Sequence, residues 1–240
     1  VDKEAYMRAR LFDMLIGDWD RHADQWRWGV YKNDKLTVYK PIPRDRDQAF
    51  PRYDGLLFNV IMRIPALRHM QDFKDDIKSE KWFNREPYPL DLAILQSSNL
   101  EEWKKQARYI QEHLTDDYIR KSFELIPEET KREYDDEVIN NLIKRKAKLE
   151  KFAEEYNKTL RRLVVLKGTD KDDNFIITRY PKGKTNIKIY SNDTLIFDED
   201  FNKKETKEIR LYGLNGKDQF KVDGKPTQAI VIRIIGGVDD

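Results

Sequence analysis

The sequence contains no cysteine, which excludes disulfide bonds and thiolate metal sites. It also lacks any run approaching the ~18 consecutive apolar residues that a membrane-spanning helix needs, so we expect no transmembrane segment in this chain. An excess of one charge is missing too, because 46 basic and 44 acidic residues nearly cancel. Without a long basic run, we expect no nucleic-acid partner.

Several catalytic signatures are also missing. The three histidines, at positions 22, 69 and 113, are scattered and form no H-x-x-H or H-E-x-x-H pattern, which argues against a zinc hydrolase. The serine-hydrolase pattern G-x-S-x-G and the phosphate-binding pattern GxxxxGK[ST] do not occur. The chain begins with Val1 and ends in a turn signal directly after a strand pattern, so we expect it to be a piece of a longer protein.

What is present predicts an α+β chain in two parts. Residues 1–161 read as a mostly helical region with a β-hairpin near 25–41, and residues 162–240 as a small all-β module, either sandwich-like or a β-stack. In the first part, apolar spacing predicts helices over 3–16 and over about 135–160, and a short apolar helix over 56–67. Cap residues predict further helix starts at Asn99 and Thr115.

Two segments of the β module share a glycine and aspartate pattern. "GLNGKDQF" begins at Gly213, "GTDKDDNF" begins at Gly168, and "GGVDD" at the end resembles the start of a third copy. The pattern resembles the calcium-binding nonapeptide repeat of parallel β-helices. Because such repeats bind calcium only when they stack directly, and these copies are about 45 and 23 residues apart, we expect turns between strands rather than a calcium site.

Charged and aromatic residues are concentrated in two clusters, "IGDWDRHADQWRW" at 16–28 and "KPIPRDRDQAF" at 40–50. They flank the predicted hairpin, so their ends must converge; pairing Tyr31 with Leu36 places the carboxylates of the two clusters near one another. Converging carboxylates suit Mg²⁺, Mn²⁺ or Ca²⁺. An acid–arginine network that braces the hairpin explains the same pattern equally well. The tryptophans of the first cluster either stack on a base or sugar or, as we favour, pack the hairpin against the first helix.

The two clusters resemble the C-lobe of atypical kinases. "GDWDRHADQW" is similar to the D-R-H-x-x-N catalytic loop of phosphatidylinositol 3- and 4-kinases, and to the loops of HipA-type, Fam20-type and CotH-type kinases. "DRDQAF" resembles their metal-binding segment, and the intervening hairpin belongs to those folds. The resemblance covers about residues 1–50. It implies an ATP/Mg-dependent or Mn-dependent phosphotransferase whose N-lobe lies outside the chain, so that this fragment alone would be inactive.

The resemblance assigns roles to six residues. Asp20 corresponds to the catalytic acid that orients the acceptor hydroxyl, with Arg21 and His22 as braces of the loop. Asp45 and Asp47 correspond to the divalent-metal ligands. Gln25 stands where lipid kinases place a metal-binding Asn. No Gly-rich loop and no Lys–Glu pair precede the first cluster, so the nucleotide-binding residues stay unassigned.

A second interpretation comes from a different class. The helical region followed by the β module resembles segments of large Gram-negative cell-envelope proteins. The chain would then be a non-catalytic structural or interaction module in the periplasm or cell envelope, in contact with neighbouring domains of a longer chain. This alternative predicts that Asp20, Asp45 and Asp47 are paired with arginine and bind no metal.

Overall fold

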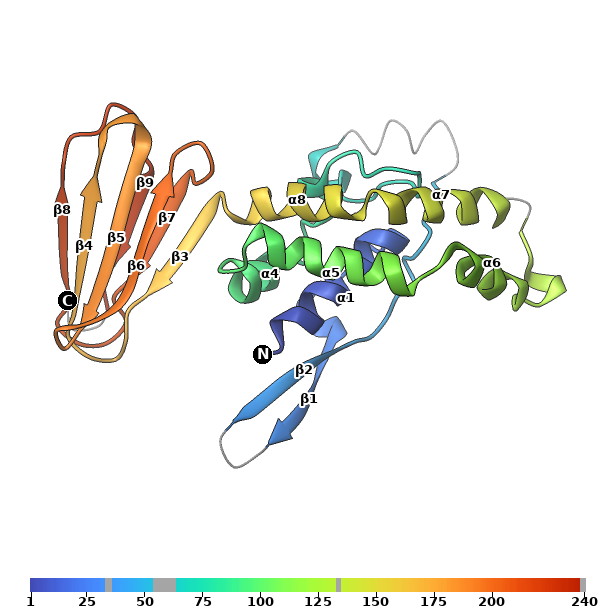
Figure 1. The fold of residues 1–240 in the computed structure, drawn as a ribbon, viewed down its shortest axis with the longest axis horizontal. Coiled ribbons are helices and arrows are strands. Elements are labelled where there is room, and N and C mark those ends of the chain that lie inside the picture. Colours follow the sequence, from blue (N-terminus) through green and yellow to red (C-terminus); the bar gives the residue numbers. More distant parts are fainter. Residues whose placement is uncertain (33–35, 54–63, 133–134, 238–240) are drawn as a thin grey trace. The chain divides into compact units, whose positions relative to one another are not determined.

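The computed structural model describes residues 1–32, 36–53, 64–132 and 135–237. The chain is α+β and forms two compact units, Val1–Asn157 and Lys158–Asp240 (Figure 1). The first is helical with one hairpin, and the second consists of β-sheets. Most of the helix expected over 56–67 lies outside the described residues.

The first helix, α1 (Lys3–Ile16), has the predicted bounds. The carboxylate of Asp2 accepts a hydrogen bond from the amide of Ala5, which caps the N-terminus, and Gly17 ends the helix with φ of 80°. Tyr6 and Leu11 on this helix are completely buried. The helix therefore lies in the core of the unit.

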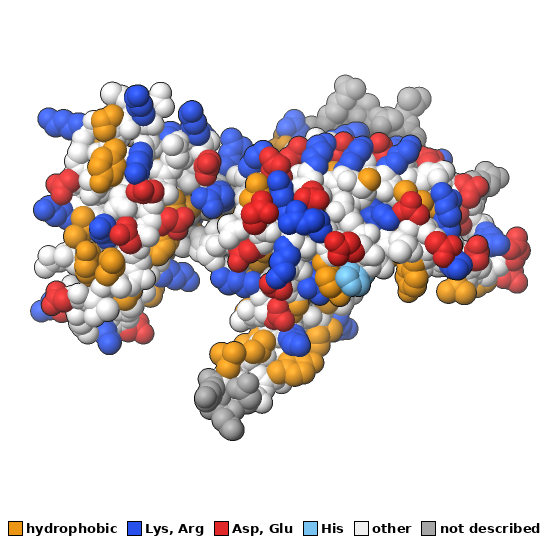
Figure 2. Space-filling model, in the orientation of Figure 1, with side chains coloured by type: hydrophobic (Ala, Val, Ile, Leu, Met, Phe, Trp, Pro, Cys, Tyr) orange, Lys and Arg blue, Asp and Glu red, His pale blue; other side chains and the backbone are white. Residues whose placement is uncertain are grey.

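The predicted hairpin forms from β1 (Trp26–Lys32) and β2 (Thr37–Pro43). Its register differs from the expected one, because Tyr31 pairs with Val38 rather than with Leu36. The backbone pairing continues to a hydrogen bond from the amide of Arg44 to the carbonyl of Gln25. The hairpin projects from the helices, and Figure 2 shows hydrophobic side chains along it.

The remaining helices of the unit are α3 (Glu80–Phe83), α4 (Tyr88–Leu95), α5 (Leu100–His113), α6 (Asp116–Glu124), α7 (Asp135–Ala147) and α8 (Leu149–Leu160). The predicted caps are confirmed: Asn99 forms a capping box with Glu102 on α5, and Thr115 caps α6. The prediction of one helix over 135–160 was wrong, because the regular structure is interrupted at Lys148 between α7 and α8. The stripe expected along it is buried, and consists of Val138, Leu142, Leu149, Phe152, Tyr156 and Leu160.

The second unit is all-β, as predicted, and its strands are β3 (Leu163–Lys167), β4 (Asp173–Arg179), β5 (Lys184–Ser191), β6 (Thr194–Asn202), β7 (Glu208–Tyr212), β8 (Gln219–Asp223) and β9 (Val231–Ile235). They form two sheets with the strand orders β3-β7-β9 and β6-β5-β4-β8. The pairs β3–β7, β7–β9 and β4–β8 are parallel, whereas β4–β5 and β5–β6 are antiparallel. The module thus has features of both expected architectures. It has two sheets, as in a sandwich, and parallel strand pairs, as in a β-stack.

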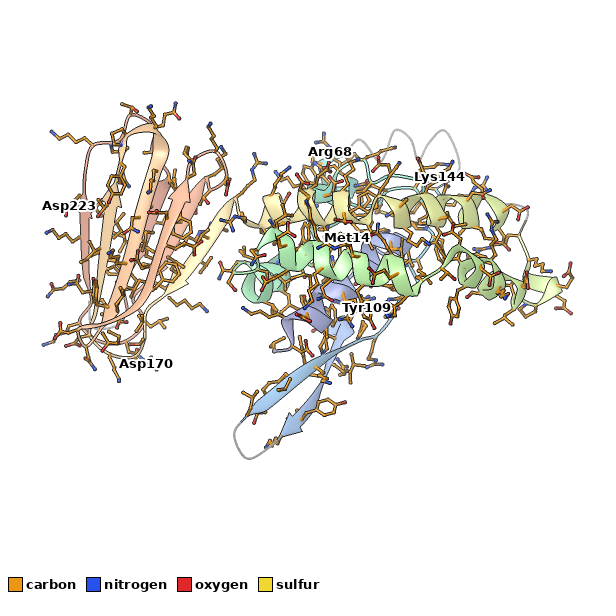
Figure 3. The ribbon with its side chains drawn as sticks, viewed as in Figure 1. Met14, Arg68, Tyr109, Lys144, Asp170 and Asp223 are labelled. Carbon is orange, nitrogen blue, oxygen red and sulfur yellow. The ribbon has the colours of Figure 1, made fainter. Side chains whose placement is uncertain are left out.

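The glycine and aspartate segments stack directly on one another, which the sequence spacing did not suggest. Phe175 pairs with Phe220, an offset of 45 residues that equals the separation of Gly168 and Gly213. Between these turns, the amide of Lys217 donates to the carboxylate of Asp172 at 2.9 Å. The β5–β6 hairpin lies between the two turns in the sequence, and because its strands extend the sheet from the side of β4 opposite to β8, it does not interrupt the stack. Figure 3 shows Asp170 at this end of the unit.

Apolar side chains fill the space between the two sheets. Strand alternation directs them inward, as in the burial of every second residue along β5. The core consists of Phe175, Ile177, Ile187, Ile189, Phe201, Ile209, Leu211 and Ile230. The second unit is therefore held by an ordinary hydrophobic core together with its stacked backbone.

Candidate functional site

A buried acid, Asp13 on α1, organises the region where the two clusters meet. Its side chain is inaccessible to solvent and accepts hydrogen bonds from Arg10 Nη1 (2.8 Å), Arg21 Nε (3.0 Å) and Arg46 Nε (3.1 Å). Arg21 belongs to the first cluster and Arg46 to the second. One carboxylate therefore joins the helix to both clusters.

Arg21 is the second organising residue, and it is also completely buried. Besides Asp13, its guanidinium pairs with Asp18 (Nη2–Oδ2, 2.8 Å) and donates to the side-chain oxygen of Gln25 at 3.2 Å and to the backbone carbonyl of Arg44. Burial and the nearby Asp13 raise the pKa of Asp18 to about 6 in spite of this partner. Arg21 thus connects its loop to α1 and to the backbone of the second cluster.

Backbone bonds complete the connection between the clusters. The amide of Phe50 donates to the carbonyl of Ile16 at 2.9 Å, and the amide of Arg44 donates to the carbonyl of Gln25 at 2.8 Å. The second cluster is therefore fixed to the first at Arg44 and at its last residue, Phe50. The expected convergence is present, and the side chains that produce it are arginines and one buried acid of α1.

The network extends into the core through Arg10. Its Nε donates to both carboxylate oxygens of Asp91 on α4, at 2.9 and 3.1 Å. The hydroxyl groups of Tyr6 and Tyr156 donate to the same carboxylate. Burial, followed by the charge of Asp91, raises the pKa of both tyrosines, so they stay protonated and act as donors. These contacts connect α1, α4 and α8.

Asp20 lies outside this network. Its side chain is partly exposed and forms no ion pair with any described residue. Burial raises its pKa, and the charges of Glu86 and Asp47 add to the increase, while His22 and His69 act in the opposite direction. Asp47 of the second cluster is therefore close enough to Asp20 to interact with it electrostatically.

Asp45 and Asp47 are both exposed, and they too form no ion pair within the described ranges. Asp45 follows Arg44, whose backbone is bonded to the first cluster, and its φ of 56° lies in the left-handed region. A non-glycine residue in this conformation is uncommon and often occurs at functional turns. A purely structural role predicted that these three acids pair with arginine. Among the described residues, they do not.

Gln25 and His22 occupy different surroundings. Gln25 is buried, and its side-chain oxygen already accepts a hydrogen bond from Arg21, so in this arrangement it braces the loop. His22 is partly exposed, and its charge acts on Asp20. Of the six residues singled out, Arg21 and Gln25 thus lie in the buried network and the other four border it.

Two of the three tryptophans of the first cluster pack the hairpin against the first helix, as we predicted. The ring of Tyr6 on α1 lies 4.6 Å from that of Trp26 and 6.0 Å from that of Trp28, so the hairpin packs on the first helix. Trp19 instead contacts His69, with ring centroids 4.7 Å apart, and its indole donates to the hydroxyl of Tyr53.

Sequence reasoning missed several residues of this region. Asp13 was counted only as part of a helix, and Glu86 and His69 lie more than forty residues from the first cluster. His69 is buried, and burial lowers its pKa, which favours the neutral ring. Only Asp13 carried a usable signal, since an acid inside an apolar helical stripe needs a buried partner.

The described residues limit what the region can hold. No group of three or more His, Asp or Glu side chains in the described part of the chain is arranged to bind a metal ion. A metal at Asp45 and Asp47 would therefore need ligands from elsewhere, such as phosphate oxygens or water. No helix in that same part is long and apolar enough to cross a membrane.

Comparisons with known proteins give no further guidance. No family model matches the chain, and no match is found among curated proteins or among solved structures.

Proposed function

We propose that residues 1–157 carry part of a phosphotransferase site of the kinase-like kind. Asp20 would receive the proton of an acceptor hydroxyl, and Asp45 and Asp47 would hold a divalent cation bound to a nucleoside triphosphate. The resemblance of the two clusters to atypical kinase loops motivates the assignment, and the arrangement of charges supports it.

One observation carries the proposal. Two arginines of the clusters pair with buried acids, Arg21 with Asp13 and Asp18, and Arg46 with Asp13. Asp20, Asp45 and Asp47 have no ion-pair partner among the described residues. Besides burial, the charge of Asp47 acts on Asp20 and raises its pKa, and acids that repel one another cost free energy unless a cation neutralises them. The buried network of arginines and acids costs free energy. Its presence is explained if it positions Asp20, Asp45 and Asp47.

The donor set fits Mg²⁺ or Mn²⁺. Mg²⁺ usually keeps several waters and is bound through one or two carboxylates together with substrate phosphates, which is what two exposed aspartates can offer. The cation would neutralise charge on the transferring phosphoryl group. The raised pKa of Asp20 suits a proton acceptor, because a carboxylate is a better base as its pKa approaches the working pH.

Thermal unfolding of the protein in the presence of Mn²⁺ and ATP tests the proposal. All five tryptophans lie in the first unit, so tryptophan fluorescence follows that unit alone. A ligand at a hundredfold excess over its Kd stabilises the native state by about 2.7 kcal/mol, which raises Tm by several degrees. We expect this increase in the native protein and its loss in Asp45→Ala and Asp47→Ala.

Asp24→Ala is the matched control, because Asp24 is an exposed acid of the same loop to which no role is assigned. It should retain the full increase. An equal increase in all variants would place the ligand elsewhere and contradict the proposal. The absence of any increase would favour the non-catalytic alternative, in which the surfaces of the unit contact neighbouring domains.

A further inference from the structure

A groove lies on the first unit between α1 and α5; it shares Arg46 with the buried network of the candidate site but contains none of the acids proposed to act there. Its volume is about 370 Å³, at the lower end of the range for small-molecule sites. Three cationic or ionisable side chains line it, Arg8, Arg46 and His113, and the remaining described lining is apolar or aromatic and includes no acid. Figure 3 shows Tyr109 on the side of α5 that faces α1.

The apolar part of the groove is formed by both helices. Ala9 and Phe12 line the groove from α1. Ile110 lines it from α5, and Leu114 lines it from the position directly after the end of α5. The ring of Tyr109 stacks on that of His113 at 4.0 Å, and the Nδ1–H of His113 donates to the carbonyl of Tyr109. These contacts fix one wall of the groove without a ligand.

Two guanidinium groups are held against rings along the groove. That of Arg8 lies 3.9 Å from the ring centroid of Tyr109, and its Nε and Nη2 donate to the side-chain oxygen of Gln106. That of Arg46 lies 5.2 Å from the ring centroid of Phe12, and its Nε donates to Asp13. A ring and a hydrogen-bond acceptor therefore hold each arginine in position. The remaining guanidinium nitrogens, Nη1 of Arg8 and both Nη atoms of Arg46, have no partner among the described residues.

From this geometry we infer that the groove binds a small organic carboxylate with a flat apolar body. The body lies on Phe12, Ile110 and Leu114, and the carboxylate accepts hydrogen bonds from Arg8 and Arg46. Charge complementarity selects the anion, because the two guanidinium groups face a cavity whose described lining offers no acid. The inference does not depend on the proposed phosphotransfer.

Ligand-detected NMR on the full chain tests this, with 2-naphthoate as the anionic probe and 2-naphthamide as its neutral counterpart. A ligand of this size in a site of this kind is expected to bind with a Kd of about 1 mM or tighter. Arg8→Gln should weaken 2-naphthoate binding about tenfold, since it removes a charge-assisted hydrogen bond, and should leave 2-naphthamide unchanged. Ala9→Leu fills the groove from α1 and should abolish binding of both probes.

Arg120→Gln, at an exposed arginine of α6 outside the groove, is the matched control and should bind as the native protein does. Unchanged tryptophan fluorescence melts show that each variant is folded. If 2-naphthoate binds no better than 2-naphthamide, or if Arg8→Gln weakens neither, the preference for an anion is wrong. If Ala9→Leu leaves binding intact, or if neither probe binds the native protein, the groove is not the site.

Discussion

The two units differ in what fills their cores. The helical unit buries a chain of charged groups that includes Arg10, Asp13, Arg21 and Asp91, all inaccessible to solvent. The hydrophobic cluster between the sheets of the β unit consists of aliphatic and phenyl groups, at the positions given above, and Asp173 is the charged residue buried in the described part of that unit. Moving charges out of water carries a large free-energy cost that ion pairing recovers only in part, so the helical unit is not built in the most stabilising way.

The difference indicates what each core achieves. Hydrophobic burial is non-directional, and it stabilises the β unit without fixing any one loop. Hydrogen bonds between arginine and carboxylate are directional, and those of Asp13 fix two loops to one helix at defined angles. Such directional contacts are what a functional site needs to hold its loops in place. Stability alone would not require charged groups in the core at this position.

The largest expected effect comes from Asp13→Asn. The substitution keeps the shape of the side chain and removes the charge shared by Arg10, Arg21 and Arg46. Breaking a buried ion pair by removing one partner costs about 3–5 kcal/mol. Urea unfolding followed by tryptophan fluorescence should show this loss in the helical unit.

Glu137→Gln is the control for the loss of charge. Glu137 pairs with Lys74, and both side chains are more than half exposed, so the expected change is about 0–1 kcal/mol. If Asp13→Asn lowers the unfolding free energy no more than this control does, the buried network does not stabilise the unit. The two cores would then differ in composition but not in the way they stabilise the protein.

Leu211→Ala tests the apolar core in the same way. Leu211 on β7 is completely buried, and truncation leaves a cavity that costs about 2–5 kcal/mol. Because the β unit has no tryptophan, the loss should be visible in far-UV circular dichroism while the fluorescence transition keeps its midpoint. Leu195→Ala on β6, where the side chain is exposed, should change stability by less than about 0.5 kcal/mol. A fluorescence transition that moves together with the dichroism would mean that the units unfold as one.

The same contrast explains what the sequence could predict. Short strand-type runs indicated an all-β module after residue 161, and caps such as Asn99 located helix starts, because those signals are local. The partners of Asp13 could not be read in advance, since Arg46 is thirty-three residues away and α1 alone gives no sign of which arginine it will meet. The break at Lys148 was missed because the apolar stripe continues across it, and the hairpin register was misplaced because the length of the turn sets it.

Gly216→Ala examines the stacked turns of the β unit. Gly216 has φ of 103°, and a Cβ there would lie 2.5 Å from the carbonyl oxygen of Lys171 in the turn stacked on it. We expect a loss of about 1–3 kcal/mol, measured by circular dichroism, because the strain is in the backbone and cannot be relieved by a rotamer change. Gly29→Ala in the hairpin is the comparison: its nearest contact is the ring of Tyr31 at 3.1 Å, an exposed side chain that can move. Equal losses at both positions would show that the stacked turns are not tightly packed.

The smallest expected effect concerns an acid pair on the helical unit. Burial, and then a hydrogen bond with Glu155, raises the pKa of Glu80 to about 7 from an ordinary value of 4.5. Between these values the native state holds a proton that the unfolded state releases, so the stabilisation is complete below about pH 4.5 and is lost as pH rises through 7. Glu80→Gln should remove this dependence.

The measurement is the difference in unfolding free energy between the native protein and Glu80→Gln, followed by fluorescence from pH 4 to pH 8. Since Glu80 is partly screened by solvent, we expect the advantage of the native protein to fall by about 1–2 kcal/mol over this range. Taking the difference cancels the titration of Asp18, which acts with the same sign and is common to both proteins. Parallel pH profiles would mean that Glu80 and Glu155 share no proton, and the helical unit would then owe its pH dependence to the charged network alone.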